Sequence, residues 1–585
     1  MSTFLTTQSL TLTHATSPLF KDLNLAINQG DKIGLIGHNG CGKSSLLKLL
    51  NGQYEASSGH IAKANHCLMS YVEQHMPPTL ASSSLINALA ETLDKAEHWR
   101  AELMLSELGF AEHEWHMSVS HCSGGQQMRL LLARAIINEP DLLLLDEPSN
   151  HLDLTSLIWL ERFLSRWKGS FILVSHDQVL LDAITNTTWI MRDQALHHFS
   201  LPCRQARVAL AEKDEQDRLR HQGEQKEIDR IEKSAKRLAT WGKVYDNEDL
   251  ARKAKTMYAR KERLEEEQTA LSEGTPWSLQ LEGEALPANR LLEIQPFALR
   301  PPASELDLFN MPEVRIKSGD RIAVLGSNGC GKSTLLNLLH QQYQVSEQHP
   351  LSTTHLAAPI TFHERCRLGY YDQTQNQLND KDSLSYALAH FSNLSDEQSK
   401  RALISAGFEY ARHGQMVSSL SGGERARLVF IGLTLAKYHL LFLDEPTNHL
   451  DMEGKEELIN TLNDFAGAVL VVSHDRSLIE QACNRFWFIQ HGVLTEYLDV
   501  EAVYQDIAKM SEHKALAKHH HTDKAKSTSK GETSDWQSLN EEALLERLIT
   551  LEDLLERDLK QKEKRQKPKL QQAWRDEIAI IQAKL

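Results

Sequence analysis

The chain has 585 residues, of which 41% are apolar and 24% charged, and its formal net charge is −15. This length is sufficient for several globular domains, each with its own core. The acidic balance argues against broad, non-specific binding to nucleic acid, so such a partner requires a local basic element. There is no apolar run near the roughly 18 residues of a membrane span, and the start of the chain does not resemble a signal peptide. The seven cysteines are dispersed without a CxxC pair, which argues against disulfides, zinc and iron–sulfur clusters. We therefore expect a cytoplasmic protein.

Strand-like stretches open the chain. Residues 10–13 and 23–27 alternate apolar and polar side chains, and the apolar run 33–36 follows them. The next residues fit a phosphate-binding loop, because its glycines let backbone N–H groups point at phosphate oxygens. Lys43 would reach the β- and γ-phosphates, and Ser44 would hold Mg²⁺. The predicted loop consists of Gly37, His38, Asn39, Gly40, Cys41, Gly42, Lys43, Ser44 and Ser45.

Further motifs follow the loop, and the second half of the chain repeats them in the same order. The first set is Gln74, Ser123-Gly124-Gly125, Asp146-Glu147 and His176. The second set is Gly326, Ser327, Asn328, Gly329, Cys330, Gly331, Lys332, Ser333 and Thr334, then Gln373, Ser421-Gly422-Gly423, Asp444-Glu445 and His474. The offset is 299 residues for the glutamines and 298 for the signatures, the glutamates and the histidines. This regularity indicates an internal duplication.

The Asp-Glu pairs end two apolar runs that predict buried parallel strands. Ligands of open α/β sheets bind beyond the carboxyl ends of such strands. We therefore expect Asp146 and Asp444 to help hold Mg²⁺, and Glu147 and Glu445 to face the attacking water.

The motifs resemble the ATP-binding cassette superfamily over roughly residues 1–500. The resemblance implies two cassettes arranged head to tail, with each ATP held between the loop of one and the Ser-Gly-Gly signature of the other. Site one would join the first loop, Gln74, Glu147 and His176 to Ser421-Gly422-Gly423. Site two would join the second loop, Gln373, Glu445 and His474 to Ser123-Gly124-Gly125.

The same resemblance implies roles for these residues. Glu147 and Glu445 would act as general base or orient water, and His176 and His474 would contact the γ-phosphate. Mg²⁺ would be held by Ser44, Gln74, Asp146, Ser333, Gln373 and Asp444. Both sites are expected to hydrolyse ATP to ADP and phosphate. Cys122 departs from the family pattern, since leucine usually precedes the signature, and the adenine-stacking positions are open, with His14 and Phe297 as candidates.

The sequences Asp-Glu-Pro-Ser-Asn-His-Leu-Asp (146–153) and Asp-Glu-Pro-Thr-Asn-His-Leu-Asp (444–451), on one chain without a membrane span, look like the ABC-F proteins. That resemblance implies a ribosome-binding ATPase whose linker reaches toward ribosomal RNA and peptidyl-site tRNA. Residues 204–285 predict a helical hairpin, and residues 232–263 contain ten Lys/Arg against five Asp/Glu. The candidate RNA contacts are Lys233, Lys236, Arg237, Trp241 and Lys243. A solvated spacer is the alternative interpretation of this hairpin.

We therefore predict an α/β protein of five segments: a first cassette (1–203), a basic helical linker (204–285), a second cassette (286–505), a low-complexity connector (506–535) and a C-terminal coiled coil (536–585). The expected protein is a monomer with paired cassettes that binds the ribosome when closed on ATP and modulates translation or protects the peptidyl-transferase centre. The alternatives are the ATPase of a transporter, and an ATPase that binds DNA through the basic C-terminal tail.

Overall fold

The computed structural model describes residues 2–509, except for 15–16, 151, 246–247, 267, 270–282, 288–289, 302–306, 349–358, 373–377, 390, 392–395, 436, 449 and 508. The chain divides into two compact units, Met1–Tyr504 and Gln505–Leu585. The first unit contains both cassettes and the linker. The predicted C-terminal coiled coil and nearly all of the connector lie outside the described residues.

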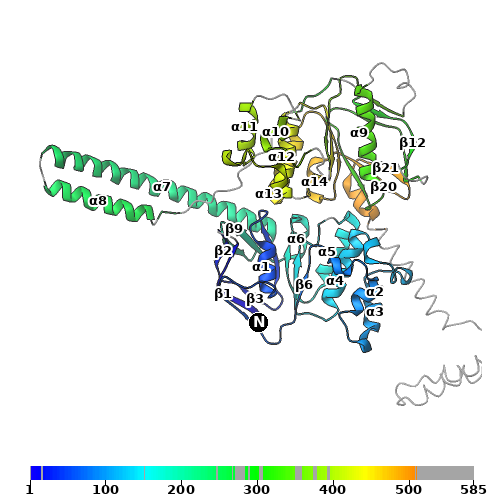
Figure 1. Ribbon diagram of the computed structural model, residues 1–585, viewed down its shortest axis with the longest axis horizontal. Coiled ribbons are helices and arrows are strands. Elements are labelled where there is room, and N and C mark those ends of the chain that lie inside the picture. Colours follow the sequence, from blue (N-terminus) through cyan, green and yellow to red (C-terminus); the bar gives the residue numbers. More distant parts are fainter. Residues whose placement is uncertain are drawn as a thin grey trace, which may run out of the picture. The chain divides into compact units, whose positions relative to one another are not determined.

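The first cassette is built on a six-stranded sheet, which is parallel except for one edge strand (Figure 1). Its strand order is β10 (Ala195–Phe199), β9 (Thr187–Arg192), β4 (Lys32–Gly37), β8 (Ser170–Val174), β7 (Leu142–Asp146) and β6 (Met69–Val72). A separate antiparallel sheet contains β1 (Thr3–His14), β2 (Ser17–Leu23), β3 (Ala26–Asn28) and β5 (Ser58–Lys63). The helices are α1 (Lys43–Leu50), α2 (Leu85–Ala90), α3 (Trp99–Glu107), α4 (Gly124–Ile136), α5 (Leu154–Arg166) and α6 (Gln178–Ile184).

The second cassette repeats this arrangement in an eight-stranded sheet. The strand order is β12 (Phe297–Leu299), β13 (Phe309–Met311), β21 (Val493–Tyr497), β20 (Arg485–Gln490), β15 (Arg321–Gly326), β19 (Ala468–Val472), β18 (Leu440–Asp444) and β17 (Leu368–Tyr371). A smaller sheet contains β14 (Val314–Ile316), β11 (Leu292–Ile294) and β16 (Ile360–Phe362). The helices are α9 (Lys332–Gln348), α10 (Leu384–Ala389), α11 (Asp396–Ser405), α12 (Gly422–Leu435), α13 (Met452–Asp464) and α14 (Arg476–Ala482).

Strand β7 shows why the apolar runs form the centre of each sheet. Leu142 and Leu144 belong to one hydrophobic core of the first cassette, and Leu143 and Leu145 belong to another. A strand that is covered on both faces needs apolar residues at every position, so the run does not alternate. The predicted α/β fold with two tandem cassettes is confirmed.

The linker is a helical hairpin of α7 (Cys203–Val244) and α8 (Glu248–Glu266), which run side by side (Figure 1). Helix α7 continues to Val244, so Trp241 and Lys243 lie in its last turn. The first turns of α7 pack into a core of the first cassette through Cys203, Ala206 and Leu210. The hairpin is therefore anchored in the first cassette. Within the described part of the chain, no helix has both the length and the apolar character that crossing a membrane requires.

Candidate active sites

Both phosphate-binding loops have the predicted form. Gly37 lies at the end of β4 with φ of 154°, and a Cβ there would lie 2.4 Å from the backbone oxygen of Met191, so only glycine fits. The Lys43 ammonium donates to the backbone oxygens of Gly37 (2.8 Å) and His38 (3.0 Å). The ammonium thus lies over its own loop, where it can meet a phosphate.

The second loop is equivalent. Lys332 donates to the backbone oxygens of Gly326 and Ser327, each at 3.0 Å. Both loops turn into helices, α1 and α9, at their lysines. Backbone N–H groups at a helix N-terminus favour an anion, so each loop can hold a phosphate chain.

Each loop serine meets the aspartate that ends a neighbouring strand. Ser44 Oγ donates to Asp146 Oδ1 at 2.9 Å, and Ser333 Oγ donates to Asp444 Oδ1 at 3.0 Å. Burial raises the pKa of both carboxyl groups, that of Asp444 to about 6. A hydroxyl and a carboxylate at this separation fit Mg²⁺, which prefers oxygen ligands and offsets the buried negative charge.

Glu147 is held by three neighbours. Its carboxylate accepts from the Gln74 amide at 2.8 Å and from the Asn150 amide, and His176 Nε2 lies 3.5 Å from Oε1. Burial raises the pKa of this carboxyl group, but the contacts with His176, Lys43 and Asn150 outweigh burial and lower it to about 2. Glu147 is therefore ionised at neutral pH.

Glu445 has a different environment. His474 Nε2 lies 3.4 Å from its Oε1, and burial raises the pKa of Glu445 to about 8. Burial together with Lys332 lowers the pKa of His474 to about 3. Both groups are therefore neutral at pH 7. Both glutamates also have positive φ, 48° at Glu147 and 49° at Glu445, a strained conformation that is typical of functional sites.

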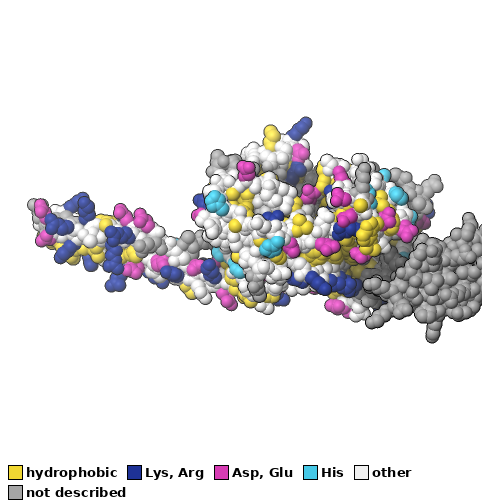
Figure 2. Space-filling view, turned by 90° about the horizontal axis from the view of Figure 1, so that it is seen from below, with side chains coloured by type: hydrophobic (Ala, Val, Ile, Leu, Met, Phe, Trp, Pro, Cys, Tyr) yellow, Lys and Arg dark blue, Asp and Glu magenta, His cyan; other side chains and the backbone are white. Residues whose placement is uncertain are grey.

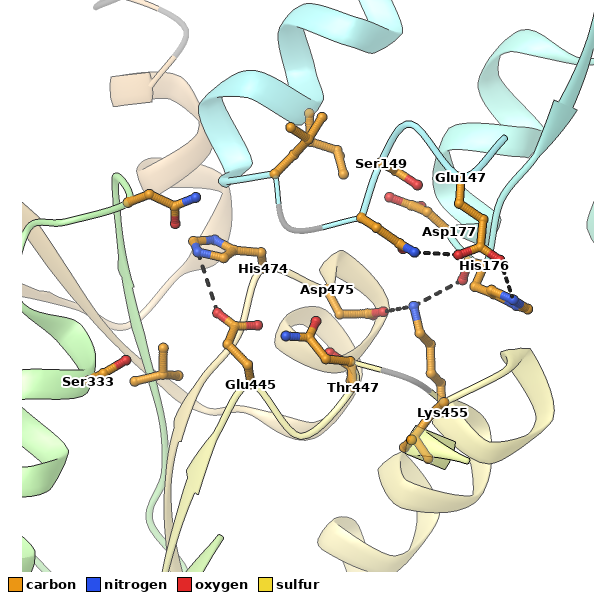
Figure 3. A pocket seen from close by; sticks show the side chains of 18 of the residues that line it. Glu147, Ser149, His176, Asp177, Ser333, Glu445, Thr447, Lys455, His474 and Asp475 are labelled. Carbon is orange, nitrogen blue, oxygen red and sulfur yellow. Dashed lines mark hydrogen bonds and ion pairs between the residues drawn. The ribbon is translucent and has the colours of Figure 1, made fainter. Parts of the chain in front are cut away.

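The signature of the second cassette faces the loop of the first. One cavity, of about 670 Å³, is lined by Asn39, Glu147 and His176 together with Ser421-Gly422-Gly423; Figure 3 shows Glu147 and His176 in it. A second cavity, of about 650 Å³, is lined by Gly37, His38 and Asn39 together with Ser421 and Gly423. Site one thus has both of its predicted walls.

Site two has a different contact across the same boundary. The larger cavity also includes Lys332, Ser333, Glu445 and His474, but Ser123, Gly124 and Gly125 line neither of these two cavities. The backbone N–H of Asn328 in the second loop donates to Asp153 Oδ2 at 3.1 Å. Asp153 therefore connects the second loop to the first cassette.

Each signature lies at the start of a helix, α4 in the first cassette and α12 in the second. Ser123 caps α4, accepting from the N–H of Gln126 at 3.3 Å, and Ser421 accepts from the N–H of Glu424 at 3.3 Å. Cys122 is buried before the first signature and leaves the cap in place.

Some predicted residues are not described or lie elsewhere. Gln373 is outside the described residues, so its place in site two stays a prediction. Phe297 packs against the core of the second cassette, and the His14 side chain is not described.

The structure adds site residues that the motifs did not predict. Asn150 holds Glu147, and the Tyr71 hydroxyl donates to Asp146 Oδ2 at 2.8 Å. Asn150 repeats as Asn448 at the 298-residue offset, and that repetition was an available signal. Lys455, which lines the larger cavity, had no such signal because its counterpart is Leu157.

Comparison with known proteins agrees with this architecture. The "ABC transporter" family model matches residues 20–150 and 309–448. The "Probable ATP-binding protein YheS" of Haemophilus influenzae is 31% identical over 531 residues, covering 84% of this chain and 80% of that protein. "ABC transporter F family member 4" of Arabidopsis thaliana is 29% identical over 559 residues, covering 84% and 74%.

Solved structures share the fold at low identity. The archaeal ribosome recycling factor aABCE1, in its complex with the ribosomal stalk protein aP1, has a TM-score of 0.59 at 16% identity over 86% of this chain and 92% of that one. The structure called "RNase-L Inhibitor" has a TM-score of 0.56 at 17% identity over 86% and 93%. The chain belongs to the ABC-F family of ATP-binding cassette proteins, and it is an ATPase.

Proposed function

We propose that this ATPase binds the ribosome while its cassettes are closed on two ATP molecules, and leaves after hydrolysis. Its hairpin contacts ribosomal RNA and the peptidyl-site tRNA, and binding modulates translation or protects the peptidyl-transferase centre. The observation that carries the proposal is a basic face on a long hairpin anchored beside site one.

The hairpin has the reach that this role needs. Helix α7 has 42 residues, which at about 1.5 Å per residue is a length of roughly 63 Å. Asp214 of α7 is tied to Arg192 of β9 by two hydrogen bonds, of 2.7 and 2.6 Å. A helix that is fixed at one end transmits movement of the cassette to its tip.

One face of α7 is suited to a phosphate backbone. Lys226, Arg230, Lys233 and Arg237 are exposed at helical spacing and line a shallow pocket together. Lys and Arg side chains gather along the hairpin in Figure 2. The buried side chains Ile228, Ile231 and Ala235 lie on another face. This separation leaves the cationic face free for RNA.

The other predicted contacts have different surroundings. Lys236 and Lys261 both pair with Glu232, so the proposed RNA face keeps Lys233 and Arg237 but gives Lys236 less weight. Trp241 is exposed, with the Arg237 guanidinium 5.4 Å from its ring centroid. This pair offers a surface on which a base can stack.

Each site residue has a role in this cycle. The loop lysines bind the phosphates, the signature serines close the site from the opposite cassette, and His176 and His474 contact the γ-phosphate. The buried Nδ1 atoms of His176 and His474 have no hydrogen-bond partner among the described residues. Each ring can therefore form a hydrogen bond with a bound phosphate. Glu147 and Glu445 orient water, and each can accept its proton only when ionised, which Glu147 already is at neutral pH. Ser44 and Asp146, or Ser333 and Asp444, would hold Mg²⁺, which would neutralise developing negative charge when bound.

The names of two structural neighbours support the ribosome as partner. The structural neighbour aABCE1 is named as a ribosome recycling factor, and another neighbour is described as a model of ribosome-bound archaeal Pelota and ABCE1. Those names describe other proteins, and here they support the proposal only through a shared architecture.

The experiment is a sucrose gradient of lysate that contains the Glu147→Gln/Glu445→Gln variant. With ATP this variant should accumulate on ribosomes, because it closes but does not hydrolyse. The control is Lys43→Met/Lys332→Met, which lacks the phosphate ligands and should stay off ribosomes with or without ATP. Sedimentation with membranes or with DNA alone would contradict the proposal.

A further inference from the structure

The boundary between the cassettes carries its cations on one side. Lys455 of α13 and Arg476 of α14 both belong to the second cassette and both contact the first. At the 298-residue offset, the first cassette has Leu157 and Gln178 in these positions. The duplication therefore conserved the site motifs but not these two charges.

Lys455 contacts two loops, one that contains His176 of site one and one that contains His474 of site two; we call them the histidine loops. Its Nζ lies 2.7 Å from Asp475 Oδ2 and donates to the backbone oxygen of His176 at 3.1 Å (Figure 3). Asp475 directly follows His474, and its other oxygen accepts from the N–H of Leu478 at 3.0 Å, capping α14. One ammonium thus joins the loop of His176 to the loop of His474.

This ammonium is charged and fixed. Burial lowers the pKa of Lys455, but the Asp475 carboxylate outweighs burial and raises it above the ordinary lysine value. Moving a buried ammonium away from its carboxylate or its carbonyl oxygen destabilises the protein, because the charge is then left without a partner. The two loops are therefore held at a set separation.

Arg476 strengthens the same boundary. Its Nη1 donates to Glu161 Oε2 at 2.6 Å, and its Nη2 lies 3.7 Å from Asp177 Oδ2. Asp177 follows His176 and caps α6 through the N–H of Leu180 at 2.9 Å. Both caps thus use one oxygen for a helix and offer the other to a cation of the second cassette.

We propose that Lys455 is a positioning residue that ties the histidine loops of the two ATP sites together, so that occupation of one site sets the position of the histidine in the other. The side chain acts through His176 and Asp475. Because Leu157 stands in the mirror position, the tie exists once. The proposal concerns the ATPase itself and stands whether or not the ribosome is the partner.

The test measures ATPase kinetics of Lys455→Leu in two single-site backgrounds. Glu445→Gln leaves only site one active, and Glu147→Gln leaves only site two active. The Leu variant should lower kcat in both backgrounds on the order of tenfold, since small displacements of a reacting group cost that much. KM for ATP should stay unchanged, because the phosphate ligands are intact. Lys455→Arg, which keeps the charge and the donors, should restore most of the rate.

Controls separate positioning from folding. Lys381→Leu removes an exposed lysine of the same cassette and should leave both rates unchanged. If Lys455→Leu does not fold, Asp475→Asn tests the tie instead, because it keeps an oxygen for the helix cap and removes the negative charge. A loss confined to site two, unchanged kcat in both backgrounds, or a loss of ATP affinity that Lys455→Arg does not restore would overturn the proposal.

Discussion

Arg207 of the linker helix binds Glu456 of the second cassette, with 2.7 Å between Nη2 and Oε2. Arg207 Nη1 also lies 3.4 Å from Gln178 Oε1 of the first cassette. The first part of the hairpin thus contacts both cassettes at their boundary. Arg207 also lines the cavity that contains Gly37 and Ser421, so this ion pair lies between site one and the rest of the hairpin.

Reversing this ion pair should uncouple the hairpin from the sites. Arg207→Glu or Glu456→Arg alone should lower the ribosome-stimulated ATPase rate several-fold, because like charges then face each other. Glu456 is about half exposed, so the effect on unfolding free energy should stay near ~1 kcal/mol. The double variant should regain stimulation. Equal stimulation in all three variants would show that the pair has no part in coupling.

The two site glutamates should respond oppositely to pH in protein without nucleotide or Mg²⁺. Folded Glu445 keeps its proton up to about pH 8, while the unfolded side chain releases it near 4.5, so stability falls as pH rises between these values. Folded Glu147 is ionised above about pH 2, so its stabilising contribution is present above pH 4.5 and is lost as pH falls toward 2.

The isosteric glutamine variants measure this difference. Glu445→Gln should raise the thermal midpoint at pH 8 more than at pH 5, because it removes a buried group that must ionise. Glu147→Gln should lower the thermal midpoint at pH 7, because it lowers the free energy of unfolding by roughly 1 to 3 kcal/mol. Differential scanning calorimetry checks both. Shifts of the same sign and pH dependence in the two variants would contradict these environments.

Blocking a signature should silence the site of the opposite cassette. Ser421 lines a cavity with Asn39 and Glu147, so Ser421→Arg should abolish turnover when only site one is active, by on the order of 10²-fold or more. Ser123→Arg should do the same when only site two is active. Single-turnover hydrolysis in the two backgrounds provides the measurement. If each signature variant instead inactivated the site built on the loop of its own cassette, the head-to-tail assignment would be wrong.

The basic face of α7 should account for ribosome affinity. Lys233→Gln/Arg237→Gln removes two cations for which the described residues show no ion pair, while Lys236→Gln/Lys261→Gln removes two that pair with Glu232. The first variant should bind ribosomes more weakly and reduce the slope of log affinity against log salt by about 2. The second should change both quantities less. Filter binding over a range of salt concentrations distinguishes them.

Much of this architecture was predictable because each motif has a local physical requirement that few structures satisfy. An unbroken run such as Leu142–Leu145 requires cover on both faces, and the glycines of the loops require a backbone that other residues do not adopt. The repetition of motifs at a nearly constant offset then predicted two cassettes. These local constraints explain why the predicted fold agrees with the structure.

Other features depend on contacts between distant residues, which spacing does not encode. Glu147 and Glu445 share one motif, but their pKa values diverge because the contacts of Glu147 with His176, Lys43 and Asn150 outweigh its burial, whereas burial dominates at Glu445. The bounds of the two helices within the predicted hairpin (204–285) also could not be read from spacing, because α7 continues through Trp241 and Gly242 to Val244. Helix packing overrides weak local signals.

The one-sided charges at the cassette boundary also make the two halves of the chain complementary to each other rather than to themselves. Two first cassettes would meet with leucine and glutamine where Lys455 and Arg476 belong, leaving Asp177 and Glu161 without cations. Two second cassettes would oppose lysines and arginines, with Ile459 in place of Glu161. Only the mixed pair therefore matches these charges, so the boundary is complementary between the two different halves of the chain.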